Sequence, residues 1–150
     1  KRRNVYGGGG IMPDYFVPMD TSAYSDYYRD LISKGIFNRF VLQYVDVHRK
    51  ELLEKHKDFI SFNTNYHASL VALDKLILYA SEEGLEFNEE DWKLSEDHIS
   101  MLFKSYMARD LWGMEHFFEV YNATDEVFLR AVEILEDPIL LYKKLANVDY

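Results

Sequence analysis

A run of four glycines, Gly7–Gly10, is the first feature whose residue types could do chemistry. Phosphate-binding loops consist of glycine-rich backbone that leads into a helix, usually with a lysine that reaches the phosphates. Here no G-x-x-x-x-G-K-[ST] motif is present, and Met12 stands where a G-x-G-x-x-G motif needs its last glycine. Pro13 favours extended backbone at Met12, so the glycines lead towards a strand. The sequence therefore predicts a tight turn at the glycines and no nucleotide-binding loop.

Neither the histidines nor the serines show a catalytic spacing. No histidine belongs to an H-E-x-x-H motif, and none has a glutamate three residues before it, the pairing of di-iron helical bundles. The serines form no G-x-S-x-G or S-x-x-K motif. We therefore expect no catalytic residue, metal site or cofactor in this chain, and we interpret His48 as a packed core residue. The residues considered are His48, His56, His67, His98, His116, Ser22, Ser61, Ser69 and Ser100.

Arg109 and Asp110 are opposite charges that stand next to the apolar pair Leu111 and Trp112. They could form a buried ion pair. Adjacent residues of a helix do not face each other, however, so we expect each to pair with a residue on a different helix. This pattern predicts a structural role for both side chains.

A set of aromatic side chains could form a binding surface. Aromatic residues make up 16% of the chain. We expect most of this set to pack in the core or between helices, and any that stay exposed to mark a docking patch for another domain. The set consists of Tyr24, Tyr27, Tyr28, Phe117, Phe118 and Tyr121.

The elements that must position these residues are predicted to be helices. No proline lies between Pro18 and Pro138, so helices can run without interruption. Capping residues, terminal glycines and apolar residues at helical spacing mark the expected boundaries. About five helices are predicted: from Thr21 or Ser22 to Gly35, 36–56, 66–83, from Ser95 through Gly113, and from Thr124 or Asp125 to the residues before Pro138. Between them we expect a loop at 57–65 and an acidic connection at 85–94, and after them one further helical turn at 140–145. Within the fourth helix, Gly113 is expected to introduce a kink or to let a neighbour approach closely.

The N-terminal residues differ from the rest in composition. We expect an extended arm rich in glycine and proline, in which Tyr15-Phe16-Val17 forms one short strand closed by Pro18. The predicted organisation is therefore an arm of residues 1–19 followed by a mainly α helical domain of residues 20–150.

Composition excludes several classes of function. The net charge of −9 repels phosphate backbones, so we expect no nucleic-acid partner. The chain has no cysteine, which excludes disulfides and thiolate metal sites. No apolar run approaches the ~20 residues that span a bilayer, and no signal-peptide pattern is present. Because the chain lacks an initiator methionine, we expect it to be a piece of a longer protein.

Several segments resemble a known family. Residues 3–14 (RNVYGGGGIMPD) resemble the end of the protease core of the S41 peptidases, the C-terminal-processing or tail-specific serine proteases. In that family a Gly-Gly-Ile-x-Pro-Asp phrase lies between two strands. Further segments are similar to the C-terminal helical region of Bacteroidetes-type members: 42–49 (LQYVDVHR), 104–113 (KSYMARDLWG), 117–122 (FFEVYN), and Asp125 with 131–135 (AVEIL).

The resemblance implies a peptidase that uses a serine nucleophile and a lysine base, both upstream of the glycine phrase, as is a peptide-docking PDZ domain. No residue of this chain matches the nucleophile or the base. The chain would thus be a non-catalytic helical region, in the periplasm or secreted. Its partners would be the core, the PDZ domain and the parent's peptide substrates, with a homo-oligomer possible. The alternatives are an independent helical interaction module and, more distantly, a metal-dependent helical enzyme.

Overall fold

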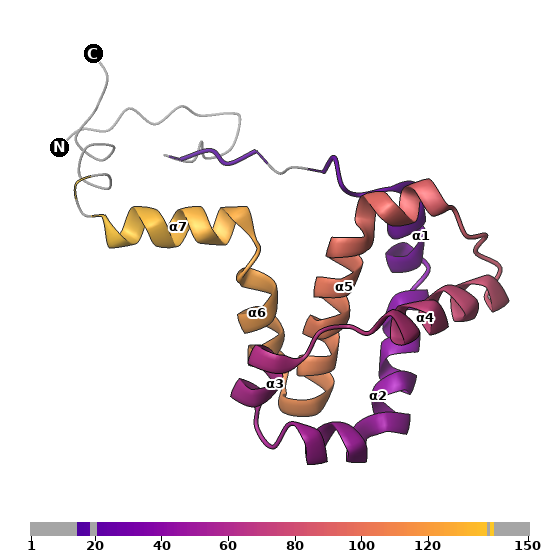
Figure 1. Ribbon diagram of the computed structural model, residues 1–150. Helices are drawn as coiled ribbons and strands as arrows, with labels where there is room; N and C mark the ends of the chain where they lie inside the picture. The colour runs from indigo at the N-terminus through magenta and orange to yellow at the C-terminus, as the bar shows by residue number, and fades with distance from the viewer. Residues whose placement is uncertain (1–14, 19–20, 138, 140–150) are drawn as a thin grey trace. The chain divides into compact units, whose positions relative to one another are not determined.

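The computed structural model describes residues 15–18, 21–137 and 139, and within these ranges it contains seven helices (Figure 1). They are α1 (Asp26–Ser33), α2 (Ile36–Lys55), α3 (Phe59–Asn65), α4 (Leu70–Glu82), α5 (Glu89–Trp112), α6 (Met114–Asn122) and α7 (Glu126–Glu136). The chain divides into two compact units. Asp20–Ala123 holds α1–α6 and is called the helical domain below; Lys1–Met19 and Thr124–Tyr150 form the other unit, which holds α7.

Side-chain caps set the start of five helices. In each, the N-cap side chain accepts a hydrogen bond from the backbone N–H three residues later, which satisfies one of the free donors of the first turn. The N-cap residues are Ser25 of α1, Asp58 of α3, Ser69 of α4, Asn88 of α5 and Asp125 of α7. The predicted mainly helical fold is confirmed, and its boundaries follow from these local signals.

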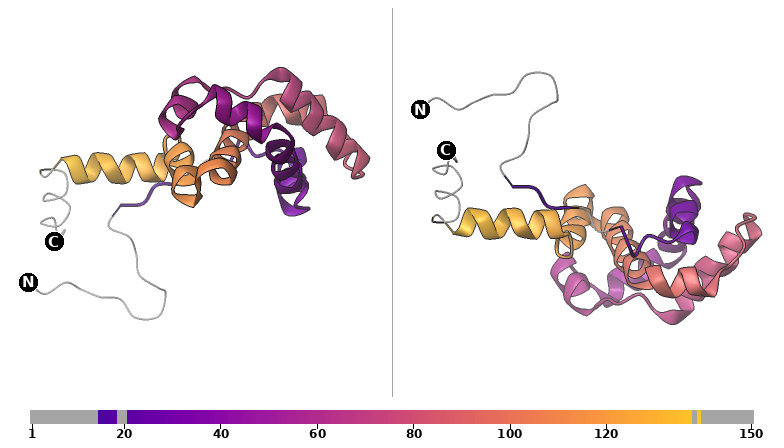
Figure 2. Two further views of the ribbon diagram at one scale, coloured as in Figure 1. Left: turned by 90° about the horizontal axis from the view of Figure 1, so that it is seen from below. Right: turned by 90° about the horizontal axis from the view of Figure 1, so that it is seen from above.

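The longest helix, α5, organises the helical domain. It packs against α1, α2, α3 and α6, whereas α4 packs against α2 (Figures 1 and 2). The ring of Phe103, at the middle of α5, is fully buried. It contacts the rings of Phe37, Phe40 and Tyr44 on α2, with centroid distances of 6.4, 6.1 and 5.4 Å. This aromatic layer is the centre of the core.

Several predicted boundaries are wrong. The first helix is capped by Ser25, not by Thr21 or Ser22. The helix predicted from residue 66 begins at Leu70, after the Ser69 cap. Residues 57–65 were expected to be a loop, but Phe59–Asn65 form α3, which buries Phe59 and Phe62. The acidic connection at 85–94 is partly helical, because α5 begins at Glu89. The predicted single helix through Gly113 is two helices, α5 and α6, that pack against each other. These differences account for the seven helices in place of about five.

The predicted strand is also absent. Tyr15, Phe16 and Val17 have no strand pairing among the described residues, and Phe16 is exposed. Three residues of high strand propensity need a partner strand to supply their backbone hydrogen bonds. The Arg130 guanidinium of α7, in the same unit, lies 5.7 Å from the centroid of the Tyr15 ring. The glycine run and the further turn at 140–145 lie outside the described residues.

Gly113 makes the turn between α5 and α6 possible. Its φ of +123° and ψ of 171° lie in a region that residues with a side chain rarely adopt. A Cβ at this position would come within 2.9 Å of an oxygen of the Glu115 side chain, which can move aside. The backbone conformation is therefore the main constraint.

Gly113→Ala is expected to lower the free energy of unfolding of the helical domain by about 1–3 kcal/mol, because alanine must adopt this disfavoured backbone conformation. Urea unfolding followed by tryptophan fluorescence measures the change, since both tryptophans, Trp92 and Trp112, lie in α5. A wild-type midpoint for Gly113→Ala would show that the turn does not need glycine.

Candidate functional site

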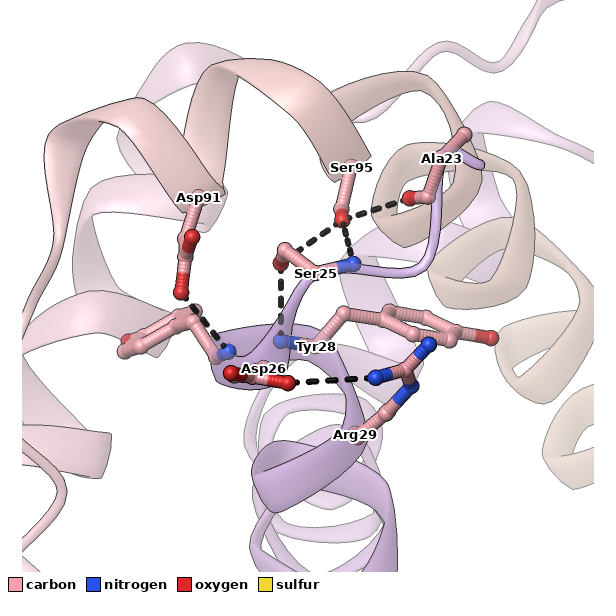
Figure 3. A network of polar contacts seen from close by, with 8 residues as sticks. Ala23, Ser25, Asp26, Tyr28, Arg29, Asp91 and Ser95 are labelled. Atoms are coloured by element: carbon pink, nitrogen blue, oxygen red, sulfur yellow. Dashed lines mark hydrogen bonds and ion pairs between the residues drawn. The ribbon is translucent and has the colours of Figure 1, made fainter. Parts of the chain in front are cut away.

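A polar junction joins the start of α1 to α5. Ser95 Oγ accepts a hydrogen bond from the Ser25 backbone N–H (3.0 Å), donates one to the Ala23 carbonyl (2.7 Å) and lies 2.8 Å from Ser25 Oγ (Figure 3). Asp91, one turn earlier on α5, accepts from the Tyr27 N–H at 3.1 Å. Ser25 and Ser95 are both buried. Every hydroxyl of the junction is thus used to fix the two helices together.

An open cleft of about 280 Å³ lies beside this junction. Its acidic side chains have structural roles: Asp91 binds the N–H of Tyr27, and Asp26 stands in the first turn of α1, where the helix dipole favours a negative charge. No group of three or more histidine and carboxylate side chains in the described part of the chain could hold a metal ion. The cleft is lined by Asp26, Tyr27, Asp30, Leu85, Glu86, Phe87, Asn88 and Asp91.

Five of the six aromatic residues singled out in the sequence lie at the seam of α1, α5 and α6. Tyr24 and Tyr28 stack at 5.2 Å, and Phe117 and Tyr121 stack at 5.6 Å. Phe118, at 5.2 Å from Phe117, is 51% exposed. The other four rings are partly buried. This is the candidate docking surface of the helical domain.

The sequence missed two members of this seam. His98 of α5 meets the edge of Tyr24 at 5.1 Å, and Tyr106 of α5 lies 5.5 Å from Phe117. We define the tyrosine cluster as Tyr24, Tyr28, His98, Tyr106, Phe117 and Tyr121. Tyr27 does not belong to it, because its ring faces Phe87 and Trp92 in the core.

Tyr28 is influenced by tyrosines from both parts of the cluster. Burial, together with the neighbouring Tyr24, Tyr121 and Tyr106 groups, raises the pKa of Tyr28 from 10.0 to about 12. Burial alone raises the pKa of Tyr27 to about 12. A neutral phenol is therefore preferred at both positions.

Tyr28→Phe is expected to make the domain less sensitive to alkali. Between pH 10 and about 12 the unfolded chain releases the Tyr28 proton before the folded chain does, so stability falls as pH rises through this window. The variant loses this contribution, and its unfolding free energy should fall less steeply there while changing little at neutral pH. Urea unfolding at a series of pH values measures the slope. An unchanged slope would contradict the placement of Tyr28.

Arg109 and Asp110 correct the sequence-based expectation. They pair with each other, with Nε 2.7 Å from Asp110 Oδ1. We expected each side chain to pair with another helix. Arg109 does so as well, since its guanidinium also donates to Asn38 Oδ1 of α2 at 2.9 Å. It lies 4.3 Å from the Tyr106 ring centroid as well. The long arginine side chain thus reaches the adjacent aspartate, although the two residues point in different directions from the helix.

Lys104 and Ser105 are adjacent in sequence, yet they form no catalytic pair. Lys104 Nζ donates to the Asn63 carbonyl in the last turn of α3 at 2.6 Å, and burial lowers the pKa of Lys104. Ser105 Oγ is fully buried and donates to the Met101 carbonyl one turn earlier on α5. Lys104 thus joins α5 to α3, whereas the Ser105 hydroxyl bonds only within α5.

The remaining candidate residues are dispersed. His48 lies against Tyr44 at 4.5 Å, and His116 stacks on Phe59 at 4.0 Å. His56 is buried between the rings of Phe62 and Tyr66. Ser69 caps α4. The structure therefore brings none of these histidines together, and His67 is exposed. Among the described helices, none has the length and apolar character to cross a bilayer.

The fold and the seam define a helical domain with a half-buried aromatic surface. Residues 27–113 match the model of a family of unknown function, DUF8443. The match covers more than half of the chain, and the chain belongs to this family. It runs from α1 to Gly113 at the end of α5. No curated protein and no solved structure matches the chain.

Proposed function

We propose that this chain is the non-catalytic helical region of an S41 serine peptidase, whose Ser-Lys dyad lies upstream of the chain. The observation that carries the proposal is the sequence phrase Gly9–Asp14 (GGIMPD), together with the similarity of the helical segments. The region packs on the peptidase core, limits access to it or mediates oligomers. The parent enzyme acts in the cell envelope, in the periplasm or after secretion.

The side chains of the helical domain support a non-catalytic role. A Ser-Lys dyad needs a lysine that is neutral near pH 7 and directed at a serine. Lys104 has a lowered pKa but is bound to a backbone carbonyl, and Ser95 is enclosed in the junction of α1 and α5. Neither group is free to attack a peptide.

The purified chain is expected to cleave no peptide and to resist labelling by a fluorophosphonate, a probe that reacts with activated serines. An active serine protease serves as the positive control in the same reaction. Turnover or stoichiometric labelling of the folded chain would contradict the non-catalytic assignment, and mass spectrometry of the labelled peptide would identify the serine.

A second candidate function is an independent protein-interaction module. The partly buried tyrosine cluster and the neighbouring exposed Phe118 favour it, because aromatic rings that remain partly accessible provide contact area for a partner. Limited proteolysis distinguishes the two proposals. Rapid cleavage within 1–19 favours the peptidase region. Resistance there, with a defined partner whose binding is lost in Phe118→Glu and kept in Leu94→Glu, favours the module.

A further inference from the structure

The outer side of α4 exposes large apolar side chains that no element covers among the described residues. Val71 and Leu78 are 65% and 64% exposed. The opposite side of the helix packs on α2 and buries Ala72, Leu73, Leu76 and Ala80. Burying exposed aliphatic side chains against a neighbour removes their surface from water, which favours association. The exposed side is therefore a candidate contact surface.

The exposed residues follow a regular pattern, which we call the α4 stripe: Val71, Asp74, Lys75 and Leu78. Val71 and Leu78 are seven residues apart, nearly two full turns, so they lie in line on one side of the helix. Along the helix axis, Asp74 and Lys75 lie between Val71 and Leu78. They flank the line through these two residues, one on each side. The stripe thus has an apolar centre with one negative and one positive edge.

The charges of the stripe are available for a partner. Asp74 makes no ion pair or hydrogen bond within the described part of the chain, and both charged side chains are exposed. The Lys75 ammonium lies 5.9 Å from the centroid of the Tyr44 ring, a contact that is weak at an exposed site. An ion pair with a closer carboxylate would replace this contact at little cost.

We propose that the α4 stripe binds the α4 stripe of a second copy, with the two helices parallel about a two-fold axis. In this arrangement Val71 meets the second copy's Val71, and Leu78 meets its Leu78. The two-fold axis brings each Asp74 opposite the second copy's Lys75, as flanking charges pair in parallel coiled coils. An antiparallel pair would instead place like charges together, so the charge pattern selects the parallel arrangement. The proposal is independent of the peptidase assignment.

The predicted dimer is weak. With 13 residues, α4 is about 20 Å long at 1.5 Å per residue. Such a contact is smaller than the ~800 Å² per partner of a standard stable interface. Two copies that each carry a net charge of −9 also repel each other. Association is therefore expected only towards high micromolar protein.

Sedimentation velocity from micromolar to near-millimolar protein tests the proposal. The wild-type chain is expected to change from monomer to dimer over this range. Leu78→Asp should weaken association at least tenfold, whereas Leu94→Asp, the same change at an exposed leucine of α5, should not. Circular dichroism verifies that each variant stays helical. A wild-type chain that remains monomeric throughout, or Leu78→Asp and wild-type chains that associate equally, would overturn the proposal.

Charge exchange tests the parallel arrangement itself. Asp74→Lys places two positive charges on the stripe and Lys75→Asp places two negative ones, so each variant alone should remain monomeric. An equimolar mixture should form a heterodimer, because every facing pair then has opposite charges. Asp97→Lys makes the same aspartate-to-lysine change on α5 and is the control for net charge. Because it leaves the α4 stripe unchanged, it should not associate with the Lys75→Asp variant. A mixture that stays monomeric would contradict the parallel pairing.

Discussion

Phe103→Ala is expected to lower the free energy of unfolding of the helical domain by about 3–5 kcal/mol, the usual cost of removing a fully buried phenylalanine ring. Phe103 is fully buried and contacts three aromatic rings of α2. The deletion removes these contacts and leaves a cavity between α5 and α2. Because domains of this size are commonly stable by 5–15 kcal/mol, the loss is a large part of the total.

Urea unfolding followed by the fluorescence of the two tryptophans of α5 measures this change. Phe118→Ala is the matched control, since Phe118 is half exposed and contacts one ring, that of Phe117. We expect Phe118→Ala to lower the free energy of unfolding by about 1 kcal/mol or less. Equal losses in the two variants would show that the aromatic layer around Phe103 is not the centre of the core.

Ser95→Ala is expected to lower the free energy of unfolding of the helical domain by about 2–4 kcal/mol. The substitution leaves the Ser25 N–H and the Ala23 carbonyl without their partner in a buried site, and each unsatisfied group costs about 1–3 kcal/mol. The start of α1 is the element that these bonds hold against α5 (Figure 3). Hydrogen exchange of the α1 amides should therefore accelerate more than that of α6.

Ser105→Ala is the control for this experiment. Ser105 is also a fully buried serine of α5, but its hydroxyl donates to the Met101 carbonyl of the same helix. The helix already supplies that carbonyl with a hydrogen bond, so the deletion leaves no group unsatisfied. We expect a change below about 1 kcal/mol. If both variants lose the same stability, the junction between Ser25 and Ser95 has no special role.

The sequence allowed prediction of helices where local signals were strong. Asp125 was one of two predicted caps for the last helix, and it does cap α7. The start of α5 was missed although its signal is present: Asn88 precedes three acidic residues, a common first-turn pattern. Helix α3 has only 7 residues, and Asn63 and Asn65 are weak helix formers. Its stability comes from burying Phe59 and Phe62, which local sequence does not reveal.

The candidate site was predictable only in part. In the predicted first helix, four-residue spacing places Tyr24 and Tyr28 together and apart from Tyr27. The two rings do stack, although Tyr24 precedes α1 and the helical reason does not hold. The influence of Tyr106 and Tyr121 on the pKa of Tyr28 depends on how α6 packs along α5. The bond between Ser25 and Ser95 joins residues 70 positions apart. Neither interaction leaves a pattern in the sequence around the residues that make it.

Our central proposal is that this chain is the helical region of an S41 peptidase. The coding sequence on the 5′ side of the Lys1 codon tests it most directly. We expect it to encode a serine and a lysine in the S41 pattern. In the expressed full-length protein, replacing either one with alanine should abolish peptide cleavage. An upstream sequence without that serine and lysine, or a full-length protein whose cleavage survives their replacement, would contradict the assignment.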